Sequence, residues 1–277
     1  VNGKITLSEA FALQSMRYWR MSPYRRVLND FNFFEFIMDS IIELKKRGHK
    51  LSINQFNVGL FSDDGNVDDF LELLEENKIG SDIDKAYKLV KNKYGEQVPN
   101  HAKIAKKESA FRDYGNTVFR VLQLTGFVTI DYKGVLLLSP NENRINFYNA
   151  LKAQNFRITS EAKEDEEKYF EQLGAYDSEL DNLVVSYRDK VDHSTAEYNK
   201  KIPEIISSYG LNKDLIKQAL IKVSMGDTRG KDCFWFIQAP VKFEFLLTLY
   251  AYMYFGNDFI YKPNYICDEA GIPYSHA

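Results

Sequence analysis

Residues 119–138 read FRVLQLTGFVTIDYKGVLLL and contain the change of periodicity that decides the fold. Up to Leu124 the apolar residues recur at helical spacing, and a Thr-Gly pair then ends the helical pattern. The rest of the stretch is rich in β-branched and aromatic residues on both sides of Lys133-Gly134, which is typical of a β-hairpin. A helix followed directly by a hairpin is the arrangement of a winged helix, so we predict a winged-helix DNA-recognition region here.

Basic side chains precede this stretch and also lie within it. Such side chains contact phosphates, and arginine also reads guanine edges in the major groove. The alternative is a solvated helix face, which is what most lysine-rich faces are. We favour DNA contact, and the candidate DNA-binding residues of this region are Lys103, Lys106, Lys107, Arg112, Arg120 and Lys133.

A second candidate DNA-contacting stretch lies near the N-terminus. Residues 17–26 read RYWRMSPYRR and interleave arginines with aromatic residues. Arginines bridge phosphates, and aromatic rings pack on sugars. The alternative, an amphipathic connector whose side chains cover a core, has equal weight. The arginines concerned are Arg17, Arg20, Arg25 and Arg26.

The segment between residues 31 and 94 predicts further helices of the same region. Residues 31–47 form a strongly amphipathic helix with a basic end, and Ser52 is a candidate N-cap for a short helix that ends at Gly59. Helices in tandem, separated by a few residues, fit a helix-turn-helix or winged-helix module. The acidic run at 63–69 only partly matches a calcium loop, because Asp69 stands where the sharp turn needs glycine. We interpret the run as a turn followed by an acidic helix start.

Residues 159–232 are helical and acidic in pattern. We predict short helices over residues 187–198, 202–209 and 213–223, which suit a spacer between a DNA reader and a nuclease. His193 has no nucleophile motif around it, so we interpret it as a surface histidine.

Residues 241–253 are apolar on almost every helical face, which predicts a buried helix. Pro240 suits the first turn of this helix and Gly256 its end. Glu244 lies inside the apolar surface, where a carboxylate needs a cationic, hydrogen-bonded or metal partner.

The alternative for Glu244 is a position in water. In that case it would share a polar stripe of the helix with Lys242 and Thr248. Spacing alone leaves both interpretations open.

Composition indicates a globular protein. The 277 residues carry a formal net charge of −3, which by itself does not favour a nucleic-acid binder. However, residues 1–158 have four more basic than acidic residues, and residues 159–277 have seven more acidic than basic ones. Affinity for DNA depends on local cationic patches more than on total charge, so the first half remains a candidate reader.

Cysteine use and hydropathy predict a cytoplasmic protein. There are two cysteines, Cys233 and Cys267, without metal-ligand spacing, and no signal peptide is recognisable. No apolar run reaches the roughly 18 residues of a membrane span. These features indicate a reducing compartment, no disulfide framework and no membrane partner.

Several ordered motifs resemble one family. They are Ala-Pro-x-x-x-Glu-Phe-Leu-Leu-Thr-Leu at 239–249, Pro-Asn-Tyr at 263–265 and Asp-Glu-x-Gly-x-Pro at 268–273. Phe-Arg-x-Leu-x-Leu-Thr-Gly-Phe at 119–127, followed by the hairpin and a helix over 142–154, is a further match. Together they resemble the AlwI family of type II restriction endonucleases and related nicking enzymes.

The resemblance implies a catalytic and metal-binding role for Glu244, Mg²⁺ as the cofactor of the full-length enzyme and double-stranded DNA as the substrate. In that family, the equivalent run leads into the PD-(D/E)xK motif. The resemblance therefore implies that this chain is truncated before the motif, and that it binds an asymmetric DNA site without cutting it. Transient dimerisation or a second subunit would serve double-strand cleavage.

The expected architecture is mainly α (α+β). We predict a DNA-recognition region with winged-helix modules over 1–157, a helical linker over 158–235, and the first helix and hairpin of a restriction-endonuclease-like nuclease domain over 236–277. A non-enzymatic winged-helix regulator, with a structural Glu244, is the alternative from another class. A helical protein-interaction module is a third.

Overall fold

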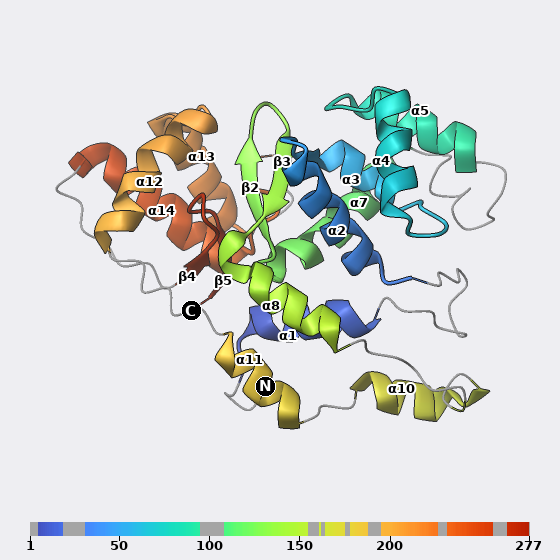
Figure 1. The fold of residues 1–277 in the computed structure, drawn as a ribbon. Coiled ribbons are helices and arrows are strands. Elements are labelled where there is room, and N and C mark those ends of the chain that lie inside the picture. The colour runs from blue at the N-terminus through green and yellow to red at the C-terminus, as the bar shows by residue number, and fades with distance from the viewer. Residues whose placement is uncertain are drawn as a thin grey trace.

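The computed structural model describes residues 5–18, 31–94, 108–154, 161, 164–174, 178–187, 195–226, 232–256 and 265–276. Within these residues the fold is mainly helical, with a three-stranded and a two-stranded antiparallel sheet (Figure 1). The prediction of a mainly helical fold with little sheet is confirmed. None of the described helices is both long and apolar enough to cross a membrane.

The helices and strands follow one another as α1 (Leu7–Tyr18), α2 (Phe33–Lys46), β1 (Leu51–Ser52), α3 (Ile53–Gly59), α4 (Val67–Glu76), α5 (Ile83–Tyr94), α7 (Glu108–Leu124), β2 (Val128–Tyr132), β3 (Leu136–Pro140), α8 (Glu142–Ala153), α10 (Glu166–Gly174), α11 (Ser178–Ser186), α12 (Thr195–Ser208), α13 (Lys213–Ser224), α14 (Ala239–Phe255), β4 (Tyr265–Cys267) and β5 (Pro273–His276).

The start of α3 shows how the local sequence fixes a helix. The Ser52 hydroxyl accepts the Gln55 N–H, and the Gln55 side chain accepts the Ser52 N–H in return. This capping box satisfies two backbone donors that the first helical turn leaves unpaired. The predicted N-cap at Ser52 and the helix that ends at Gly59 are both confirmed.

The hairpin is the centre of the larger sheet. Strands β2 and β3 pair from Val128↔Pro140 to Tyr132↔Leu136, and Gly134 takes a φ of 75° in the turn between them. The predicted hairpin is therefore confirmed. Strand β1 adds to β3 on the other side, giving the order β1-β3-β2. In Figure 1 the hairpin stands between α12–α14 on one side and α2–α5 on the other.

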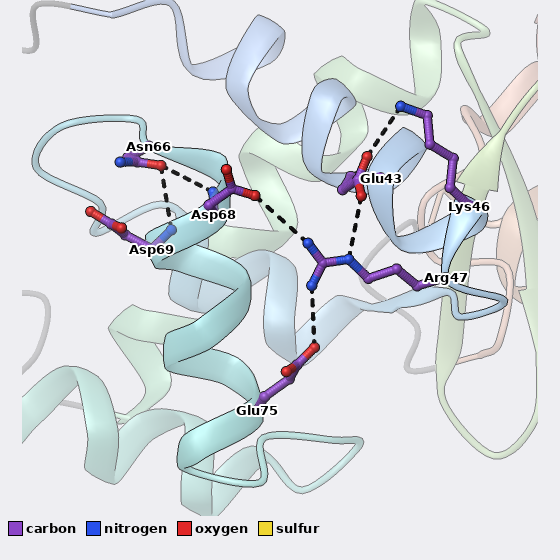
Figure 2. A network of polar contacts seen from close by, with 7 residues as sticks. All are labelled: Glu43, Lys46, Arg47, Asn66, Asp68, Asp69 and Glu75. Carbon is purple, nitrogen blue, oxygen red and sulfur yellow. Dashed lines mark hydrogen bonds and ion pairs between the residues drawn. The ribbon is translucent and has the colours of Figure 1, made fainter.

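Arg47, at the end of α2, links this helix to α4. Its guanidinium lies 3.4 Å from a carboxylate oxygen of Glu43, 3.4 Å from one of Glu75 and 3.6 Å from one of Asp68 (Figure 2). These groups are largely solvated, so the network orients α4 and adds little stability. Asn66 caps α4, which confirms the interpretation of the acidic run as a turn and a helix start.

The prediction of separate helices over 187–198 and 202–209 is wrong. A single helix, α12, runs through Pro203, where the sequence predicted separate helices on either side of residue 200. Proline removes one backbone donor from a helix interior. The buried side chains of Tyr198, Ile202 and Ile205 lie on the face that packs into the core, and this burial offsets the loss.

The C-terminal part joins the rest through one helix and one hairpin. Helix α14 packs along α13, and strand β5 contacts α14, α7 and α1. The β4–β5 hairpin reverses at Gly271, so the predicted strand and reversal are confirmed for residues 265–276. Residues 257–264, between α14 and β4, lie outside the described residues.

Candidate nucleic-acid interface

Helices α3 and α7 cross at a glycine. A Cβ atom on Gly115 would lie only 2.0 Å from Oδ1 of Asn57, whose side chain is buried. No side chain larger than hydrogen fits at this crossing, so the two helices approach more closely than their other residues would allow. Close approach fixes the direction of α7 relative to α3 and to the hairpin that follows α7.

Helix α7 divides into a buried apolar face and an exposed polar face. The buried residues include Phe111, Val118, Phe119 and Leu122. The exposed residues are Arg112, Asp113, Thr117 and Arg120. Arg112 and Arg120 are eight positions apart, which places them on one side of the helix. The structure thus brings two of the predicted DNA-binding arginines onto one exposed face.

Arg120 has a structural contact that the sequence did not reveal. Its guanidinium donates to the backbone oxygen of Trp235 at 2.9 Å and lies 5.4 Å from the centre of the Trp235 ring. Phe119 also packs against Trp235 and Phe236. Arg120 therefore connects α7 to the turn that precedes α14, and this contact engages part of its guanidinium.

Lys133 is exposed at the tip of the hairpin. Lower on the same hairpin, Asp131 pairs with Lys50, which follows α2. This ion pair links the hairpin to the segment that follows α2. Lys133, at the tip, remains solvated.

The remaining predicted DNA-binding residues are distributed as follows. Arg17 lies in the last turn of α1 and its side chain is 9% exposed, so burial removes it from the surface. This placement fits the connector interpretation for that residue. The other predictions lie outside the described residues: Arg20, Arg25, Arg26, Lys103, Lys106 and Lys107.

Glu244 is half-buried on α14. The alternative of a solvated polar stripe shared with Lys242 and Thr248 is wrong, because these two residues are buried. The Lys242 ammonium lies 2.5 Å from an Asp232 oxygen, and the Thr248 hydroxyl donates to the Glu244 backbone oxygen at 2.9 Å. Lys242 and Thr248 thus each have a polar partner, and such partners offset the free-energy cost of burying polar groups.

The outer face of α14 is apolar, so the prediction of a helix buried on almost every face is also wrong. The exposed residues are Phe243, Leu247, Tyr254 and Phe255. The helix itself is confirmed, with Pro240 in its first turn and Gly256 at its end.

A buried group of hydroxyl and thiol side chains lies near Glu244. The Tyr198 and Tyr265 hydroxyls are 2.6 Å apart. Burial raises the pKa of both phenols and of the Cys267 thiol, and the Glu244 carboxylate adds a smaller rise for Tyr265 and Cys267. These three groups are therefore neutral hydrogen-bonding groups at physiological pH.

The described part of the chain does not form a metal site. No group of three or more His, Cys, Asp or Glu side chains in it has the geometry to hold a metal ion. Asp268, the acid that follows Cys267, is fully engaged by backbone N–H groups. Glu244 alone cannot hold Mg²⁺, which needs several oxygen ligands in octahedral geometry. His193 lies outside the described residues.

Sequence reasoning missed Trp235, Gln123 and Asp268. Each acts through a partner more than 100 positions away: Arg120, Pro273 and Ile130 respectively. Periodicity and local motifs carry no signal for such contacts. The sequence marks Asp268 only as an acid in a glycine-containing turn and does not show its burial.

The family model of the AlwI restriction endonucleases matches residues 1–227. No curated protein matches the chain. The matched segment includes α7, the β2–β3 hairpin and α8, whereas the motifs at 239–273 lie beyond it. The truncation before a PD-(D/E)xK motif stays a prediction. Because the match covers most of the sequence, the chain belongs to the AlwI restriction endonuclease family.

Proposed function

We propose that this chain recognises a specific asymmetric site on double-stranded DNA through a winged helix built from α2, β1, α3, α7, β2 and β3. Its family consists of restriction endonucleases, which cleave DNA sequence-specifically. The proposal assigns to these residues the recognition half of that activity.

The order of the elements supports a winged helix. A helix, a short strand and two crossing helices precede the hairpin, and the sheet has the order β1-β3-β2. Helices α4 and α5 are inserted between the two crossing helices. In such a module the helix directly before the hairpin enters the major groove. That helix is α7.

The exposed position of Arg112 on α7 is the observation that carries the proposal. Arg112 lies on the polar face of the helix, and its side chain is exposed. Arginine at this place can donate two hydrogen bonds to one guanine. Lys133, at the tip of the hairpin, would then contact a phosphate beside the groove.

Hydrolysis by a type II, magnesium-dependent mechanism is a further proposal that rests on the resemblance at Glu244. The described residues do not fit a magnesium site, since Glu244 has no set of companion acids among them. The proposal for these residues is therefore recognition, and Glu244 is proposed as one candidate metal-shell acid.

The experiment is DNA binding across a salt series with single variants. We expect Arg112→Ala to weaken binding to the preferred sequence by about tenfold, the lower range for one bidentate base contact. We expect Lys133→Ala to weaken binding equally on all sequences and to reduce the salt slope by about one. Fluorescence anisotropy with labelled duplexes measures both effects.

The matched control is Lys222→Ala, an exposed lysine on α13. Binding by this variant should equal that of the unchanged chain. If Lys222→Ala weakens binding as much as Arg112→Ala, the binding is non-specific charge attraction and the proposed interface is wrong.

A further inference from the structure

Asp268 is a buried carboxylate that joins two sheets. One oxygen accepts the Ile130 N–H of β2 at 2.9 Å, and the other accepts the Ile272 N–H of its own turn at 2.8 Å. The side chain is 2% exposed. Asp268 thus connects the recognition hairpin directly to the C-terminal β4–β5 hairpin.

The position of Ile130 explains why a hydrogen-bond acceptor is needed here. In the order β1-β3-β2, strand β2 has β3 on one side only, so its other edge presents unpaired backbone groups. Asp268 supplies an acceptor for one of these groups. The C-terminal hairpin therefore contacts the free edge of β2 through a side chain and does not add a further strand to the sheet.

Two other contacts fasten the same junction. The Gln123 side-chain amide, near the end of α7, donates to the Pro273 backbone oxygen at 2.8 Å. The Tyr274 ring lies against Gly126, where a Cβ atom would be 2.5 Å from the ring. The end of α7 and the start of β2 are thus both held by the C-terminal hairpin.

The other side of this hairpin contacts the helix that carries Glu244. Tyr265 of β4 packs edge-to-face on Phe245 of α14, with ring centres 6.1 Å apart. Strand β5 also contacts α14. A continuous set of packed residues therefore runs from α7 and β2, through Asp268, to α14.

We propose that Asp268 is a positioning residue that transmits DNA binding at α7 and the β2–β3 hairpin to helix α14, where Glu244 lies. The proposal rests on the proposed function, because it takes α7 and this hairpin as the DNA-binding surface. Movement of β2 on DNA acts on the C-terminal hairpin through the Ile130–Asp268 hydrogen bond, and the hairpin acts on α14 through Tyr265.

The free-energy cost of burying the Asp268 carboxylate supports its role as a positioning residue. Burial raises the pKa of Asp268 to about 7, although the backbone donors and Lys201 favour the charged form. The neighbouring Cys267 and Tyr209 are neutral at physiological pH because burial raises their pKa values. Both Asp268 oxygens accept backbone N–H groups, whereas an asparagine has only one accepting oxygen, so the two contacts together require the carboxylate.

The test is hydrogen exchange, followed by mass spectrometry, on the 277-residue chain with and without a random-sequence DNA duplex at low salt. In the unchanged chain, we expect DNA to slow exchange in α14 by at least about fivefold, the lower range of measured couplings between sites. In Asp268→Asn, we expect the affinity for DNA to stay within about twofold, because no DNA contact is removed, while the effect on α14 disappears. If Asp268 had a merely structural role, its replacement would not abolish the effect of DNA on exchange in α14 while leaving the affinity for DNA unchanged.

The matched control is Glu269→Gln, which removes the neighbouring charge from the same turn and should behave as the unchanged chain. Gln123→Ala, which removes the bond to Pro273, replaces Asp268→Asn if that variant does not fold. DNA binding without any change in α14, or a full effect on α14 in the variant, would overturn the proposal. If the unchanged chain binds no DNA, the proposed function itself fails, and the transmission fails with it.

Discussion

Helices α7 and α14 have the same length, 17 residues, but opposite surfaces. The exposed face of α7 carries Arg112 and Arg120, whereas that of α14 carries Phe243, Tyr254 and Phe255. In α14 the charged Lys242 is buried instead. An amphipathic sequence thus determines its own buried face, whereas a uniformly apolar helix takes its orientation from the residues packed around it.

The partners of α14 are specific. Lys242 pairs with Asp232 just before the helix, and Phe245 packs between Phe234 and Tyr265. These contacts select the face that carries Lys242 for the interior, although other faces of the helix are more apolar. An ion pair and an aromatic cluster thus determine which face of α14 is buried, whereas in α7 the spacing of the apolar residues determines it.

The largest expected effect comes from breaking the ion pair of α14. Asp232→Asn leaves the Lys242 ammonium buried without its counter-ion, and we expect the free energy of unfolding to fall by about 3 kcal/mol. Lys242→Met removes the charge and keeps the volume, so we expect a change below about 1 kcal/mol. Urea denaturation measures both. Equal losses in the two variants would show that the pair does not orient the helix.

A smaller effect is expected on the α7 side. Gly115→Ala forces a methyl group against Asn57, and we expect a loss of about 2 kcal/mol, as for other overpacked sites. The control is Gly80→Ala, because a Cβ atom there meets no atom within 4 Å. Thermal unfolding at matched concentration measures the difference.

The cause of this loss can be checked in a double variant. Oδ1 of Asn57 has no hydrogen-bond partner, so Asn57→Ala should cost little through that atom and should make room for the new methyl group. We expect it to restore much of the stability lost in Gly115→Ala. If the two losses simply add, the crossing is not limited by this contact.

Local signals were sufficient for much of the fold. Ser52 predicted its helix by capping chemistry, and the Lys133-Gly134 turn predicted its hairpin. Strand β1 could not be predicted, because it has two residues and exists only by pairing with β3. The separate helices predicted over 187–198 and 202–209 are one helix in the structure from Thr195 to Ser208, because burial holds it together through Pro203.

The candidate site was less predictable than the fold. The exposure of Arg112 and Lys133 followed from periodicity and turn position. The contact of Arg120 with Trp235 and that of Asp268 with Ile130 join residues 115 and 138 positions apart. Only the folded chain brings such pairs together, and for this reason the surroundings of Glu244 could not be derived from the sequence.

The most direct test of the central claim is selection of a random pool of duplex DNA by the chain, followed by sequencing of the retained duplexes. We predict enrichment of one short asymmetric sequence, lost in Arg112→Ala and kept in Lys222→Ala. Retention of DNA without any enriched sequence, or no retention even at low salt, would contradict the assignment of α7 and its hairpin as the recognition surface.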